Sequence, residues 1–72
     1  MRQDTINKPV GYNPDPAYIR SLIADTGLSV HQVGMTIGVS ERSLRDYCRG
    51  VYRVPYPVQY ILETLSVAKK VN

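Results

Sequence analysis

The spacing of apolar residues predicts that the fold begins with an amphipathic helix. Apolar side chains recur at intervals of three and four residues, which places them on one helix face: Tyr18, Ile19, Leu22 and Ile23. Asp15 can cap the free amides of the first turn, and Pro16 suits the first helical position, where no N–H is needed. Gly27 can adopt the left-handed conformation that ends many helices. These signals predict a helix over residues 16–26.

Two further short helices are predicted from cap signals and from the apolar residues that follow each cap. Ser29, with Gln32 three residues later, has the pattern of a capping box, and Gly38 supplies an end for this helix. Ser40 is the next cap, for a helix over residues 41–49. The apolar positions of the two helices are Val30, Val33, Ile37, Leu44, Tyr47 and Cys48. A very short connection therefore joins the two helices.

A fourth helix is predicted after a proline-rich connector. Pro57 can open this helix, which we expect to run to about residue 68. Its apolar positions follow the i, i+3, i+4, i+7 spacing and are expected to face the core: Val58, Ile61, Leu62 and Leu65. No segment alternates like a strand over more than a few residues. The expected fold is all-α, a compact domain of four helices or of five, with residues 1–13 as an N-terminal arm and residues 14–72 as the folded domain.

Length and cysteine content limit the class of protein. A chain of 72 residues forms one domain at most, because domains usually have about 100–150 residues. No apolar run approaches the roughly 20 residues of a membrane helix or the about 7–15 of a signal peptide, so we expect a cytoplasmic protein without a membrane partner. The single cysteine, Cys48, excludes an internal disulfide, and small domains without such cross-links often gain stability by self-association.

The chain has no recognisable catalytic or metal-binding pattern. It has no paired carboxylates, no nucleophile with a neighbouring base and no glycine-rich phosphate loop, so we expect neither an enzyme nor a small-molecule substrate. His31 is the only histidine and has no second ligand at a suitable spacing, so no metal and no cofactor are expected. Arg20 and Asp25 are interpreted as surface charges.

The basic residues are concentrated in one part of the chain. Nine Lys and Arg residues against six Asp and Glu residues give a net charge of +3, which permits a polyanionic partner. Residues 40–53 alone contain four arginines and two acidic residues, a local balance of 4 − 2 = +2. The positive charge thus gathers on the helix over residues 41–49 and the connector that follows it.

Residues 28–50 meet the requirements of two helices that pack across a tight turn. Their sequence is LSVHQVGMTIGVSERSLRDYCRG. Gly34 is the small residue needed where the first helix approaches the second, Gly38 can take the positive φ of the turn, and Ser40 caps the second helix. With its flanking helices, this pattern resembles the helix-turn-helix of the Cro/phage-repressor (XRE-type) regulators over about residues 16–68.

Three runs carry a narrower resemblance. They are NPDPAYIRSLIADTG, GVSERSLRDY and PYPVQYILETL, which are similar to segments of the small anti-CRISPR-associated repressors of phages. The resemblance implies a Cro/lambda-repressor-like domain that binds an inverted repeat in double-stranded DNA as a homodimer. It also implies that the protein represses its own anti-CRISPR operon by occupying the promoter.

The same resemblance implies which residues meet the DNA. The first residues of the second helix of the motif face base edges in the major groove. Arg42 is the strongest candidate, because a guanidinium matches the O6/N7 pair of guanine, whereas Glu41 either accepts from a cytosine amino group or serves only as a charge at the helix end. Many relatives have a glutamine where this chain has Val30, so that contact is not expected here. The candidate DNA contacts are Ser29, His31, Gln32, Ser40, Glu41, Arg42, Ser43, Arg45, Asp46, Arg49 and Arg53.

The partner-chain surface is expected on the last helix, away from its apolar face. Tyr60, Thr64 and Val67 lie there, and Tyr56 just before the helix is assigned either to this interface or to DNA. An alternative function is an antitoxin-like or adaptor module that uses the same fold to bind a protein. Charge alone also leaves RNA open as the nucleic acid.

Overall fold

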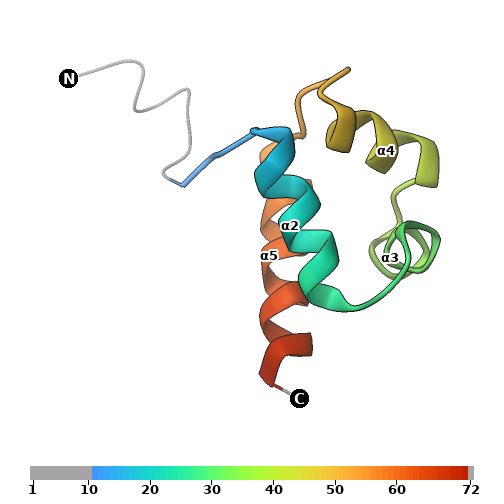
Figure 1. Ribbon diagram of the computed structural model, residues 1–72, viewed down its shortest axis with the longest axis vertical. Helices are drawn as coiled ribbons and strands as arrows, with labels where there is room; N and C mark the ends of the chain where they lie inside the picture. Colours follow the sequence, from blue (N-terminus) through green and yellow to red (C-terminus); the bar gives the residue numbers. More distant parts are fainter. Residues whose placement is uncertain (1–10, 72) are drawn as a thin grey trace.

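The computed structural model describes the backbone of residues 11–71 and the side chains of residues 11–69 (Figure 1). This part of the chain contains helices and loops and no strand, which confirms the all-α prediction. The helices are α2 (Pro16–Thr26), α3 (Val30–Ile37), α4 (Glu41–Arg49) and α5 (Tyr56–Val71). None of them combines the length and the apolar character that crossing a membrane requires.

The predicted caps begin the first three of these helices. Asp15 Oδ1 accepts a hydrogen bond from an amide of the first turn of α2, at 2.9 Å. At α3 both halves of the capping box are present: the Gln32 amide donates to Ser29 Oγ and the Ser29 amide donates to Gln32 Oε1, each at 3.0 Å. Ser40 Oγ caps α4 by accepting from an amide of its first turn at 3.1 Å. Local sequence signals therefore set where each helix begins.

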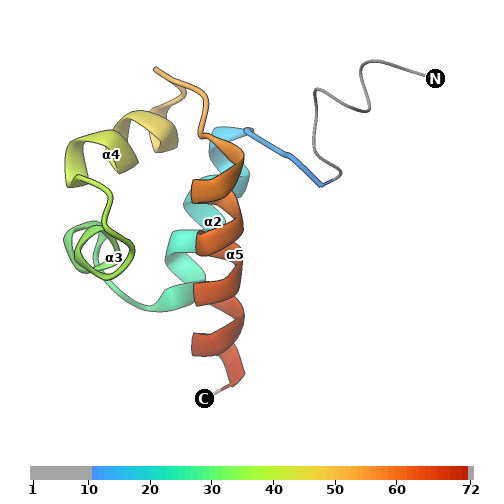
Figure 2. The ribbon, with the colours of Figure 1, turned by 180° about the vertical axis from the view of Figure 1, so that it is seen from behind.

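The helices form two groups in space. α2 and α5 lie side by side, and α3 and α4 lie on one side of that pair in both views (Figures 1 and 2). All four helices and the α4–α5 connector contribute to one core of buried apolar side chains: Ile19, Leu22, Ile23, Val33, Leu44, Val54 and Leu62. The core holds α4 by its inner face and leaves its outer face to solvent.

The last helix differs from the prediction in length and in its buried face. It begins one residue earlier and ends three residues later than expected, at Tyr56–Val71. Leu62 is fully buried as predicted, but the core position predicted for Ile61 is wrong, since this side chain is 42% exposed. Gln59 is buried in its place, with 0% exposure.

A contact with the N-terminal segment explains this buried glutamine. Gln59 Oε1 accepts from the Asn13 amide at 2.9 Å, and Gln59 Nε2 donates to the Gly11 carbonyl at 2.7 Å. Tyr12 adds a hydrogen bond to the Val54 carbonyl at 2.6 Å. A buried amide side chain is stable only when its polar atoms find partners, and these backbone groups provide them. Residues 11–13, part of the predicted arm, thus pack against α5. Residues 1–10 of the predicted arm lie outside the described residues.

Candidate nucleic-acid interface

A close contact between α3 and the turn fixes the position of α4. Gly38 has φ +78°, and the amides of Gly38 and Val39 both donate to the Gly34 carbonyl, at 2.8 and 3.0 Å. A Cβ atom on Gly34 would lie 2.5 Å from the Val39 carbonyl oxygen, a distance that real Cβ atoms essentially never show. The small residue and the positive φ predicted for this unit are therefore both present in the structure. The turn directs the outer face of α4 away from the core.

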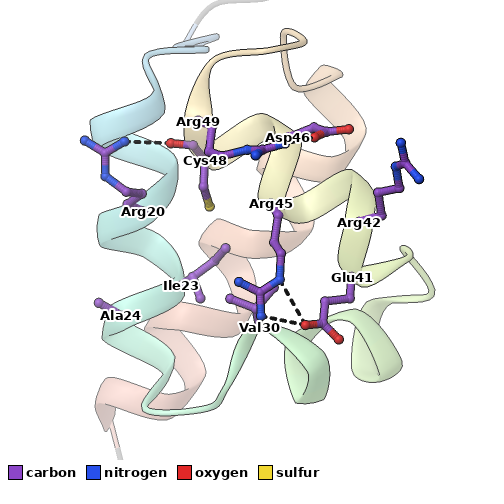
Figure 3. A pocket seen from close by; sticks show the side chains of 10 residues that line it. All are labelled: Arg20, Ile23, Ala24, Val30, Glu41, Arg42, Arg45, Asp46, Cys48 and Arg49. Atoms are coloured by element: carbon purple, nitrogen blue, oxygen red, sulfur yellow. Dashed lines mark hydrogen bonds and ion pairs between the residues drawn. The ribbon is translucent and has the colours of Figure 1, made fainter.

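Glu41 lies at the centre of a network of polar contacts on this outer surface. Its Oε2 atom accepts from Arg45 Nη2 at 2.6 Å and from Arg45 Nε at 3.0 Å (Figure 3). Its Oε1 atom lies 3.2 Å from His31 Nδ1, although His31 belongs to α3. The hydrogen bond from Arg45 is the main reason that the pKa of the Glu41 carboxyl lies below its ordinary value. Glu41 therefore holds two predicted DNA-contacting side chains in place.

The arginines of α4 differ in whether a carboxylate neutralises them. Arg45 pairs with Glu41, and Arg49 donates to Asp46 at 2.6 Å. Arg42 is exposed and has no hydrogen bond or ion pair with any other described residue. Its side chain points away from Glu41 and Arg45 (Figure 3). Arg42 is consequently the one arginine of α4 that no described carboxylate neutralises.

The remaining sequence-predicted contacts lie around the two helix starts. Ser29 and Gln32 form the cap of α3, and Ser40 and Ser43 form the cap of α4, where their hydroxyls lie 3.0 Å apart. These side chains therefore have structural partners in the free protein. The exposed Arg53 follows in the connector after α4 and has no polar partner among the described residues.

One contact at this surface was not predicted from the sequence. Arg20 of α2 is exposed, as expected of a surface charge, but its Nη1 atom also donates to the Cys48 carbonyl at 2.6 Å. No sequence signal links these residues, which lie 28 positions apart. The Glu41–Arg45 pair, in contrast, has the i, i+4 spacing of helical ion pairs and could have been found in the sequence.

A groove of about 750 Å³ runs between α2, the start of α3 and α4. Its charged lining consists of four arginines and the two carboxylates that pair with two of them: Arg20, Arg42, Arg45, Arg49, Glu41 and Asp46. Apolar atoms of Ile23, Ala24 and Val30 lie between them, so the groove combines a basic rim with an apolar floor (Figure 3). We call it the α2–α4 groove.

The groove also contains Cys48, and the chemistry of this thiol is limited. Burial raises the pKa of the Cys48 thiol above its ordinary value, which lowers its thiolate content at neutral pH. In the described part of the chain, no group of three or more His, Cys, Asp or Glu side chains could hold a metal ion.

The residues expected at a partner-chain interface lie on the exposed part of α5. Tyr60, Thr64 and Val67 are exposed, and Tyr56 is half-buried with its ring against those of Tyr12 and Tyr60, at centroid distances of 6.2 and 6.3 Å. Ile61, which lies outside the core, lines a shallow second groove with Tyr60, Thr64 and residues of α3. Most of this surface lies away from the arginines of α4.

Comparisons with known proteins do not assign the chain to a family. No protein-family profile matches the sequence, and none of the curated proteins does. The resemblance to the Cro/phage-repressor regulators therefore rests on the sequence motifs alone.

Proposed function

We propose that this protein is a sequence-specific DNA-binding repressor whose α3 and α4 form a Cro-type helix-turn-helix. In this proposal α4 enters the major groove with its first turn toward the base edges. The start of α3, with His31, faces the DNA backbone. Repression follows because a protein bound at the promoter excludes RNA polymerase from the same DNA, including the promoter of its own operon.

The observation that carries the proposal is the unpaired Arg42 in the first turn of α4. Arg45 and Arg49 are neutralised by carboxylates of the same helix, whereas the guanidinium of Arg42 keeps all its donors for a ligand. An arginine in this position can donate two hydrogen bonds to O6 and N7 of guanine. Arg42 is therefore assigned to base recognition.

The other candidate residues take supporting roles in the proposal. Both carboxylate oxygens of Glu41 already have partners in the free protein, so we assign Glu41 to orienting Arg45 and His31 rather than to a cytosine. Arg49 and Arg53 provide positive charge for phosphates, which strengthens binding to any sequence. Specificity and affinity are thus assigned to different residues.

A homodimer would bring two copies of α4 to one operator. Such a dimer reads two half-sites from the same side of the duplex, where they lie about 34 Å, or one helical turn, apart. The exposed apolar surface of α5, with Tyr60, Ile61 and Val67, is the proposed dimer interface. Sedimentation equilibrium of the protein and of its Tyr60→Glu variant tests this assignment. A wild-type protein that stays monomeric at micromolar concentration would contradict it.

DNA titrations followed by fluorescence anisotropy test the proposal. The duplex upstream of the gene and a random duplex of equal length are compared at two salt concentrations. Specific binding of wild-type protein is expected to be at least about a thousandfold tighter than random binding. Arg42→Ala should reduce the binding free energy for the upstream duplex by about 1–3 kcal/mol, which is a roughly 5- to 150-fold loss of affinity. Its loss of affinity for random DNA should be smaller.

Two further variants serve as controls for this loss. Arg49→Ala should weaken binding to both duplexes alike, because phosphates are present in every sequence. Lys69→Ala removes an exposed charge near the far end of α5 and should change neither affinity. Equal losses from Arg42→Ala on both duplexes would refute its role in base recognition. A wild-type protein that binds neither duplex would favour the adaptor or antitoxin-like alternative.

A further inference from the structure

Arg20 lines the α2–α4 groove from the side opposite α4. Its guanidinium points toward the end of α4 and donates to the Cys48 carbonyl at 2.6 Å (Figure 3). That carbonyl belongs to the last turn of α4, where the helix dipole is negative and favours a cation. The contact holds an arginine of α2 beside the proposed recognition helix.

Most donors of Arg20 remain available to a ligand. A guanidinium has five N–H donors in a planar fork, and the hydrogen bond to Cys48 uses one of them. Arg20 has no carboxylate partner among the described residues, unlike Arg45 and Arg49. The side chain is exposed but oriented by the Cys48 carbonyl, so a ligand would meet a pre-positioned cation.

The two kinds of surface in the groove match the chemistry of a nucleic-acid backbone. A sugar–phosphate strand alternates anionic phosphates with the apolar C–H faces of deoxyribose. Arg20, which no carboxylate of the groove neutralises, can bind a phosphate, and the floor formed by Ile23, Ala24 and Val30 can pack against the sugars. The groove runs beside α4, where a strand bordering the major groove would pass.

We propose that Arg20 binds a DNA phosphate and that the α2–α4 groove receives the strand beside α4. This inference rests on the proposed DNA binding and adds to it a contact from outside the helix-turn-helix. Because Arg20 is held against the end of α4, its contact also sets how far α4 enters the major groove. Arg20 is a positioning residue and does not read a base.

Two substitutions separate a phosphate contact from a purely structural clamp. Arg20→Gln removes the charge, whereas Arg20→Lys keeps it and replaces the planar guanidinium by an ammonium group. If Arg20 only ties α2 to the Cys48 carbonyl, its positive charge makes no contribution of its own to DNA binding. A phosphate contact needs it, because counterion release depends on the number of phosphates neutralised.

The experiment is the salt dependence of binding to a random-sequence duplex, which requires no knowledge of the operator. Arg20→Gln should reduce the slope of log K against log salt by about 0.9 per protein chain bound. Arg20→Lys should retain the wild-type slope, as should Lys69→Gln, the matched loss of a remote charge. Circular dichroism of each variant verifies that it is folded.

The outcomes separate this inference from the proposed function. A folded Arg20→Gln protein with the wild-type slope would overturn the phosphate contact, while a preference of wild-type protein for the upstream duplex would still stand. Arg20→Lys and Arg20→Gln proteins with equally reduced slopes would also overturn it in favour of the clamp. A wild-type protein that binds no duplex would overturn both proposals.

Discussion

Replacing Gly34 by alanine tests the close approach that positions α4. The added Cβ would lie 2.5 Å from the Val39 carbonyl oxygen and 3.5 Å from Leu44 Cδ1. Favourable non-bonded contacts lie at about 3.5–4.0 Å, so the turn must move away from α3 by about 1 Å. The obstacle is a backbone atom and cannot rotate away as a side chain would.

Two opposing effects decide how much stability the Gly34→Ala protein loses. Alanine is favoured over glycine inside a helix by about 1 kcal/mol. Overpacking a well-packed site costs about 1–3 kcal/mol, and the upper half of this range applies here because the turn is held by the Val39–Gly34 hydrogen bond of 3.0 Å. The expected net destabilisation of Gly34→Ala is about 1–2 kcal/mol. For a domain of this size, it corresponds to a decrease in Tm of about 4–16 °C.

Urea and thermal unfolding, followed by far-ultraviolet circular dichroism, measure this difference. Met35→Ala is the matched control, because Met35 is the next residue of the same helix and is 74% exposed. Its effect should stay within about 0.5 kcal/mol. A Gly34→Ala protein as stable as the wild type, or more stable, would refute the argument, since helix propensity would then act without any clash. DNA affinity should fall together with stability, because the same displacement moves α4.

Two other predictions concern the polar contacts that hold α2 and the N-terminal segment against α5. Gln59→Leu should destabilise the fold by about 1–3 kcal/mol and accelerate hydrogen exchange at the Asn13 amide, which loses its 2.9 Å acceptor; unchanged exchange at that amide would contradict the predicted loss. The hydrogen bond to Glu63 raises the pKa of Tyr18 to about 12, above its ordinary value of 10.0, so the unfolded chain loses this phenolic proton first as the pH rises. The stability from this contact is complete below about pH 10 and is lost between about pH 10 and 12. The difference in unfolding free energy between wild-type and Tyr18→Phe proteins, measured by urea unfolding, should therefore shrink across that range. A difference that is independent of pH would show that the contact contributes nothing.

The candidate interface was predictable where its chemistry depends on neighbours within one helix. The arginines after Ser40 could be assigned to the start of α4 because the cap and the two glycines around them define that helix. Which of these arginines remains available was decided by pairing. Arg45 pairs with Glu41 and Arg49 pairs with Asp46, whereas Arg42 makes no ion pair although Asp46 also lies four residues after it. Arg20 reached the end of α4, and His31 reached Glu41, only because other helices pack against α4.

By itself, the sequence determined the helix starts at Asp15, Ser29 and Ser40 and the sharp turn at Gly38, because caps and turns depend on hydrogen bonds and backbone freedom within about four residues. Only the tertiary structure decided which face of α5 is buried. Apolar spacing favoured Ile61, yet Gln59 lies inside, because partners 46 and 48 positions earlier satisfy its amide. The same is true of the α2–α4 groove, in which Arg20 meets a carbonyl 28 positions away. Such contacts depend on how helices pack, and packing brings together groups that no local pattern relates.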